Sequence, residues 1–100
     1  MTKTDTTNMT EQSEEVKIPR QYAVVLYNDD FTPMGFVVQL LQHVFGLEIG
    51  QASAIMLEVH EKGQAIAGVF SKEIAETKVT QALRIAAHFA HPLHCEAKPV

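Results

Sequence analysis

The stretch Tyr22-Ala-Val-Val-Leu-Tyr27 runs directly into Asn28-Asp29-Asp30-Phe31-Thr32-Pro33-Met34, and the rest of the chain is best understood from this junction. The apolar first part, rich in Val and Tyr, predicts a buried strand over residues 22–27. Thr32 and Pro33 predict the start of a helix, with Thr32 as its cap and Pro33 as its first residue. Between them, Asn28, Asp29 and Asp30 place two carboxylates and an amide side by side. Such a cluster of acceptors suits a cation, either a metal ion or an ammonium group.

Two helices are predicted after this junction. Apolar side chains recur at helical spacing from Phe36 to Phe45, and Gly46 is a natural stop. A second helix is expected over residues 48–62, because Gly63 again marks an end. Its inward stripe is predicted to consist of Ile49, Ala52, Met56 and Val59.

The remainder predicts two more strands around a third helix. Residues 64–70 are short, apolar and bounded by turn signals. Ser71 can cap the next helix and Pro92 prevents its continuation, so residues 93–97 are left for a last strand. The inward residues of this helix are predicted to be Ile74, Ala75, Val79, Ala82, Leu83, Ala86 and Phe89. The expected fold class is α+β, with a small three-stranded antiparallel sheet packed against three helices in the order β-α-α-β-α-β.

Length and composition restrict the function. The chain has 100 residues, which allows one small domain, and a formal net charge of −4, which argues against nucleic acid as the main partner. Cys95 is the single cysteine, so no intramolecular disulfide is possible and a reducing compartment is favoured. No signal-peptide core or membrane span is evident. The expected location is therefore the cytoplasm.

Residues 1–19 differ in composition from the rest. They are rich in Thr and acidic residues, with few large apolar side chains. Such a segment cannot bury enough surface to offset its ordering entropy. The predicted organisation is a flexible N-terminal extension over residues 1–19 and a folded domain over residues 20–100. The extension is either a passive terminus or a tethered arm that engages a partner.

Metal binding has some support in the residue types but little in their spacing. Asp29, Asp30 and His60 could ligate a metal ion, but neither an HExxH spacing nor a calcium loop is present. The residues near the C-terminus, His88, His91, His94 and Cys95, match no usual zinc pattern. Neither a metal ion nor another cofactor is expected. Asn and Asp are also common in turns, and a His near a helix end is often only a surface residue.

Four segments together resemble the ClpS family, the bacterial adaptors of the ClpA–ClpP protease. They are Val25-Leu-Tyr-Asn-Asp-Asp-Phe-Thr-Pro-Met34, Met56-Leu-Glu-Val-His60, Gly63-Gln-Ala-Ile-Ala-Gly-Val-Phe70 and Ala75-Glu-Thr-Lys78. The resemblance covers about residues 20–97. It implies a non-enzymatic adaptor that recognises N-degrons, proteins with a free N-terminal Phe, Tyr, Trp or Leu, and delivers them to the N-terminal domain of ClpA.

The resemblance also implies roles for particular residues. Asn28, Asp30 and His60 match the group that holds the substrate α-amino group, with Asp29 as an adjacent acidic residue. Glu73 and Lys78 match positions that dock ClpA. Gly35 departs from the family pattern, in which a larger polar residue is common at the rim. The hydrophobic pocket is implied to consist of Thr32, Met34, Val37, Leu40, Met56, Val59 and Leu93, with Met34 as a gate at its mouth.

The chemistry of the residues agrees with an ammonium ligand. An N-terminal ammonium has three donors, and a carboxylate, an amide oxygen and a neutral imidazole can accept from them. Two other classes of function remain open from the sequence. One is a small metal-dependent hydrolase built on Asp29, Asp30 and His60, and the other is a structural protein of the ribosomal stalk type.

Overall fold

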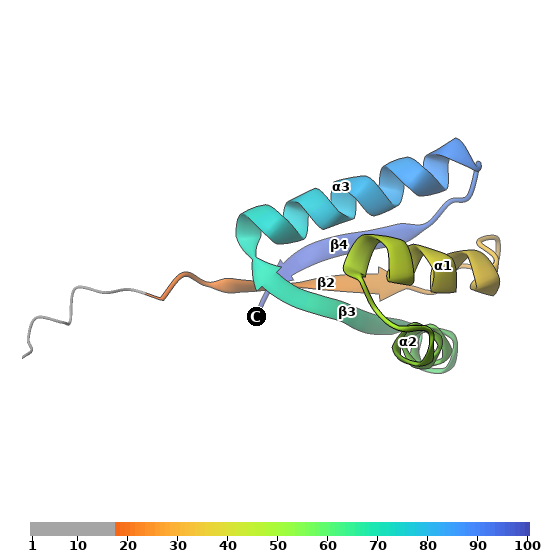
Figure 1. The fold of residues 1–100 in the computed structure, drawn as a ribbon, viewed down its shortest axis with the longest axis horizontal. Helices are drawn as coiled ribbons and strands as arrows, with labels where there is room; N and C mark the ends of the chain where they lie inside the picture. The colour runs from red at the N-terminus through yellow and green to blue at the C-terminus, as the bar shows by residue number, and fades with distance from the viewer. Residues whose placement is uncertain (1–17) are drawn as a thin grey trace, which may run out of the picture.

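A computed structural model describes residues 18–100. The expected N-terminal extension, residues 1–19, lies outside the described residues except for its last two positions. The elements follow one another as predicted from the sequence and confirm the α+β class (Figure 1). They are β2 (Gln21–Tyr27), α1 (Met34–Phe45), α2 (Ile49–Lys62), β3 (Gln64–Ser71), α3 (Lys72–His88) and β4 (His94–Pro99).

The sheet has β2 at its centre, in the order β3-β2-β4, and both neighbours are antiparallel to β2. At one end of β2, Gln21 lies opposite Ser71, and the C-terminal Val100 N–H donates to Gln21 O at 3.0 Å. At the other end, Tyr27 lies opposite Gln64 and His94. The start of the described chain, the C-terminus and the start of α3 are therefore together at one end of the sheet (Figure 1).

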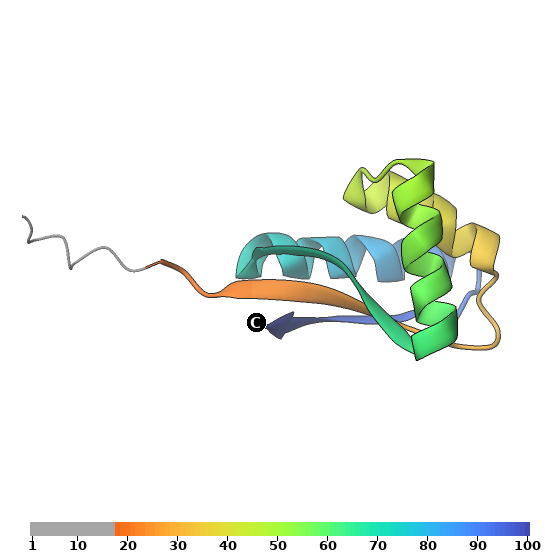
Figure 2. The same cartoon turned by 90° about the horizontal axis from the view of Figure 1, so that it is seen from below.

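The helices cover one face of the sheet, and α2 stands across the end at which β2 finishes (Figure 2). Val24 and Leu26 of β2 and Ala65 and Ala67 of β3 face the helices and are buried in one core with Leu41 of α1. Burial alternates over the first half of β3, as expected for a sheet with one covered face, whereas four consecutive residues of β2, Ala23 to Leu26, are buried. All three helices lie on the same side of the sheet (Figure 2).

Most of the predicted helix ends are confirmed. Gly46 and Gly63 adopt left-handed backbone conformations, with φ of 67° and 88°, and close α1 and α2. Ser71 Oγ accepts a hydrogen bond from Ile74 N–H at 3.4 Å and caps α3. The predicted start of α1 is wrong: Pro33 is the cap residue, with an extended ψ of 140°, and the helix begins at Met34. Thr32 makes no capping bond, because its side chain is turned into the protein.

On α2 and α3, fewer of the residues predicted to face inward are buried than expected. On α2, Ile49 is 65% exposed, although Ala52, Met56 and Val59 are buried. On α3, only the alanines of the predicted stripe are fully buried, and the larger residues Ile74, Leu83 and Phe89 are exposed. Small side chains let α3 approach the sheet closely, so the residues flanking this stripe stay outside the contact. No helix within residues 18–100 is long and apolar enough to cross a membrane.

Candidate functional site

A small cavity lies where β2 ends, under the loop that leads into α1. Its walls come from the end of β2, the loop, α1, α2 and the residue before β4, since it is lined by Leu26, Tyr27, Asn28, Asp29, Thr32, Val37, Met56, Val59 and Leu93. The cavity has a volume of about 10 Å³, which is room for about one water molecule. Apolar and polar residues thus line the same cavity.

The loop that forms the rim is held by its own polar groups. Asp29 Oδ1 accepts from the backbone N–H groups of Phe31 at 2.9 Å and Thr32 at 2.7 Å, which is an Asx-type turn. Asn28 N–H donates to Gly63 O at 2.9 Å and so joins the end of β2 to the end of α2. His60 lies on the last turn of α2, so this bond also places His60 near the rim of the cavity. The turn explains why Asp is needed at position 29 independently of any ligand.

The structure gathers most of the site residues predicted from the sequence around this cavity. Asn28, Asp29, Thr32, Val37, Met56, Val59 and Leu93 all line it. Asp30 and His60 are exposed and do not line the cavity. Met34 is 45% exposed at the start of α1, and Leu40 is buried in the core away from the cavity. Beside Met34, a Cβ added to Gly35 would meet no atom within 4 Å, so the rim is open there.

Leu26 and Tyr27 line the cavity but were not predicted as site residues. Their signal in the sequence was their position, since they are the last two residues of the strand that ends at Asn28. A strand that stops at a site contributes its final residues to the wall. The strand prediction and the site prediction, taken together, would have identified them.

The electrostatics of the cavity favour a cation. Asp29 is the one charged side chain among the lining residues, and Asp30 is exposed on the same loop. Within residues 18–100, no three His, Cys, Asp or Glu side chains gather closely enough to hold a metal ion. That finding covers both the set of Asp29, Asp30 and His60 and the set of histidines around Cys95.

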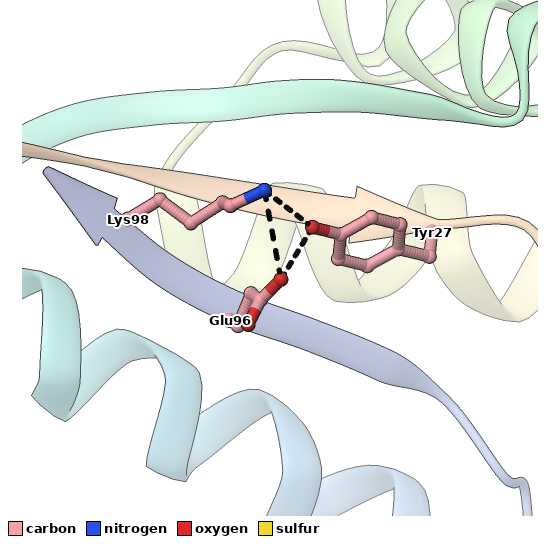
Figure 3. A network of polar contacts seen from close by, with 3 residues as sticks. All are labelled: Tyr27, Glu96 and Lys98. Carbon is pink, nitrogen blue, oxygen red and sulfur yellow. Dashed lines mark hydrogen bonds and ion pairs between the residues drawn. The ribbon is translucent and has the colours of Figure 1, made fainter. Parts of the chain in front are cut away.

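Beside the cavity, Tyr27 fixes β4 to β2. Its hydroxyl donates to Glu96 Oε2 and accepts from Lys98 Nζ at 3.2 Å, and Lys98 lies 3.9 Å from Glu96 (Figure 3). The hydrogen bond with Tyr27 raises the pKa of Lys98, with a further contribution from Glu96. The ring of Tyr27 also stacks on His94 with centroids 4.5 Å apart. These contacts hold the strand next to Leu93, which lines the cavity.

Glu73 and Lys78 lie on α3, at the other end of the sheet. Glu73 is exposed in the first turn, where a carboxylate is favourable. Lys78 Nζ donates to Val44 O at 2.9 Å and lies 5.9 Å and 5.6 Å from the ring centroids of Phe45 and Phe70. Lys78 therefore contacts the C-terminal end of α1, in addition to any role at the surface.

Comparisons with known proteins identify the family of the chain. The family model described as "ATP-dependent Clp protease adaptor protein ClpS" matches residues 17–96. The ATP-dependent Clp protease adapter protein ClpS of Roseobacter denitrificans is 54% identical over 91 residues, covering 91% of this chain and 80% of the relative. The protein of the same name from Hydrogenovibrio crunogenus is 51% identical over 86 residues, covering 86% and 83%.

A solved structure is similar over the whole of its own length. It is Agrobacterium tumefaciens ClpS2 bound to L-phenylalaninamide, with a TM-score of 0.81 and 34% identity, covering 83% of this chain and 100% of that one. Fold and sequence thus agree with the same family over most of the described chain. The protein belongs to the ClpS family of ATP-dependent Clp protease adaptor proteins.

Proposed function

We propose that this protein is a cytoplasmic adaptor, without catalytic activity, that binds proteins with a free N-terminal Phe, Tyr, Trp or Leu and delivers them to the ClpA–ClpP protease. The observation that carries the proposal is an apolar cavity that is also lined by residues of an acidic loop, Asn28 and Asp29. An amino acid at the start of a chain has the matching pair of features, a large apolar side chain next to an ammonium group. L-phenylalaninamide, the ligand of the similar ClpS2, has the same pair.

The polar half of the site is assigned to Asn28, Asp30 and His60. All three are exposed around the end of β2 and α2, so their acceptor atoms are free to turn toward a ligand. Asp29 has one oxygen engaged by the loop, which leaves the other for an indirect contact. Hydrogen bonds to a charged donor contribute about 1.5–3 kcal/mol each.

The apolar half of the site is assigned to Val37, Met56, Val59 and Leu93, with Met34 and Leu40 completing the pocket once it is occupied. A cavity of about 10 Å³ is far too small for a Phe ring, so the pocket has to widen when substrate enters. Met56 is suited to this movement, because an unbranched thioether changes shape at little cost. Burial of the ring adds about 1.5–3 kcal/mol. Neither half suffices alone after the entropy of association, so both are required.

Peptide binding tests the proposal. A fluorescent peptide that starts with Phe should bind tightly, and the same peptide with an acetylated N-terminus should lose most of its affinity. Asp30→Asn and His60→Ala should each weaken binding of the free peptide at least tenfold, because Asp30→Asn removes the negative charge that faces the ammonium group and His60→Ala removes an acceptor.

Glu76→Gln is the matched control, since Glu76 is an exposed carboxylate on α3 away from the cavity. Its affinity should equal that of the unaltered protein. Equal binding of the free and acetylated peptides would exclude recognition of the α-amino group and would refute the proposed function.

A further inference from the structure

The wall of the cavity contains one polar atom that has no partner. Thr32 is 8% exposed, and its hydroxyl oxygen makes no hydrogen bond with any described protein atom. The backbone N–H of the same residue is already engaged by Asp29 Oδ1 at 2.7 Å, so the loop is satisfied without the hydroxyl. Buried hydroxyl groups are almost always paired, and an orphan one therefore calls for an explanation.

The position of this hydroxyl suggests what its partner is. Thr32 lines the cavity together with apolar and polar residues, and none of the described groups pairs with its hydroxyl. A water molecule or a group of the ligand inside the cavity would supply the missing partner. The cavity has room for about one water.

We propose that the Thr32 hydroxyl selects tyrosine over phenylalanine as the first residue of a substrate. The inference rests on the proposed function, since it assumes that the first side chain enters this cavity. A phenol hydroxyl both donates and accepts, as does the hydroxyl of Thr, so the two form a pair in either direction. A Phe ring fills the same space but leaves Thr32 unpaired.

Tyr is expected to bind more tightly than Phe whether or not a water molecule occupies the empty cavity. If the cavity is dry, Tyr satisfies a buried polar group that Phe leaves unsatisfied. If a water molecule is present, both rings displace it, and only Tyr replaces the hydrogen bond that is lost. A net hydrogen bond between neutral groups corresponds to about a three- to tenfold difference in affinity.

The experiment uses peptides that are identical except for the first residue, which is Tyr, Phe or 4-methylphenylalanine. The methyl group of the third peptide fills the space of the Tyr hydroxyl but forms no hydrogen bond. On the unaltered protein, the Tyr peptide should bind about three- to tenfold more tightly than either of the others. Equal binding of the Tyr and 4-methylphenylalanine peptides overturns the proposal without any variant.

Two variants locate the effect at Thr32. Thr32→Val removes the hydroxyl while keeping the branched shape, and it should abolish the preference for Tyr over Phe. Thr32→Ser keeps the hydroxyl and should retain the preference. A Tyr-to-Phe ratio that is unchanged in Thr32→Val overturns the proposal, even if both affinities fall together.

Acetylated forms of the peptides separate this inference from the proposed function. If free and acetylated peptides bind alike, the proposed function fails, and the inference fails with it. If free peptides bind far better than acetylated ones but the Tyr-to-Phe ratio does not depend on Thr32, only the inference fails.

Discussion

At the scale of single residues, burial determines what the polar and reactive side chains near the site can do. Asp29 is needed for the turn, Thr32 has a buried hydroxyl without a partner, and Cys95 is 4% exposed on β4. Burial raises the pKa of the Cys95 thiol to about 11, and the nearby carboxylate of Glu96 contributes further. Cys95 therefore behaves as a small buried hydrophobe, because the reactive thiolate is disfavoured there.

We expect Cys95 to be almost inert toward iodoacetamide at pH 8 in the folded protein and to react rapidly in concentrated urea. The thiol is the one alkylation site of this type in the chain, so mass spectrometry of the intact protein measures the reaction directly. Equal rates in the presence and absence of urea would contradict the burial of Cys95.

The same raised pKa predicts how stability depends on pH. The unfolded thiol has a pKa near the model-compound value of 9.0, and the folded thiol holds its proton up to about pH 11. The contribution of Cys95 is therefore fully present below pH 9 and is lost as the pH rises toward 11. The comparison should be made between the unaltered protein and Cys95→Ala, whose stability should fall less between these two pH values.

At the scale of the elements, the end of α3 is less well adapted than the ends of α1 and α2. Ala90 follows α3 and has a φ of 59°, which lies in the left-handed region. The residues in this region after α1 and α2 are glycines, Gly46 and Gly63. The turn is nevertheless closed by a hydrogen bond from His91 N–H to Ala86 O at 2.8 Å. A residue with a Cβ is strained in this conformation by about 1–2 kcal/mol.

We expect Ala90→Gly to raise the free energy of unfolding by about 0.5–1 kcal/mol, because relief of the strain exceeds the extra entropy of the unfolded Gly. Ala54→Gly is the matched control, since Ala54 is exposed in the interior of α2. The control should lower stability by about 1 kcal/mol. Urea unfolding measures both, and a destabilised Ala90→Gly would show that the turn at Ala90 is not strained.

Lys78 connects two elements that do not follow each other in the chain. Its ammonium group caps the end of α1 at Val44 while it is carried by α3. We expect Lys78→Met to lower the free energy of unfolding by about 1.5–3 kcal/mol, the worth of a hydrogen bond to a charged donor. Lys72→Met, at an exposed position on the same helix, should have almost no effect.

This structural role affects how docking to ClpA should be tested. A loss of delivery in Lys78→Met would have two possible causes, a weakened contact between α1 and α3 and a lost surface charge. Glu73→Gln is the cleaner variant, since Glu73 is exposed and makes no ion pair among the described residues. Reduced delivery by Glu73→Gln with unchanged peptide affinity would support the assignment of this face to docking.

At the scale of the whole molecule, the candidate substrate cavity and the proposed docking residues lie at opposite ends of the sheet. Strand β2 runs from Gln21, where the described chain begins, to Tyr27 at the cavity wall. Glu73 stands near the first of these ends, since Ser71 pairs with Gln21. Under the proposed function, this separation would let substrate and unfoldase bind at the same time.

We expect deletion of residues 1–17 to leave peptide affinity unchanged and to abolish delivery to the protease. The deleted segment joins the domain at the end of the sheet remote from the cavity, which explains the first part. A tethered arm next to the docking face would raise the effective concentration of a second contact with the unfoldase, which explains the second. Fluorescence anisotropy and degradation of a Phe-initiated reporter measure the two separately.

A version in which residues 1–17 are replaced by Gly and Ser of the same length is the control for this deletion. If it supports delivery, the length of the arm matters rather than its sequence. Full degradation with the truncated protein would show that the extension is a passive terminus.

The amino-acid sequence by itself determined the order of the elements, most of their ends and the position of the polar loop that borders the cavity. These features depend on local chemistry: apolar periodicity, glycines that adopt a left-handed backbone, the Ser71 cap and a polar cluster where a strand stops. The loop at Asn28 to Asp30 is identifiable for the same reason, since its residue types are set within a few positions of one another.

Only the tertiary structure decided which side chains share the cavity and which remain at the surface. Thr32 could serve as a cap or as a wall residue, and the choice depends on α2 and Leu93, which are distant in sequence. Likewise, Ile49 and Phe89 follow an apolar period yet stay exposed, because the closeness of each helix to its neighbours determines how wide a stripe is covered. Periodicity indicates the direction in which a side chain points. Whether that side chain is buried depends on which other elements pack against it.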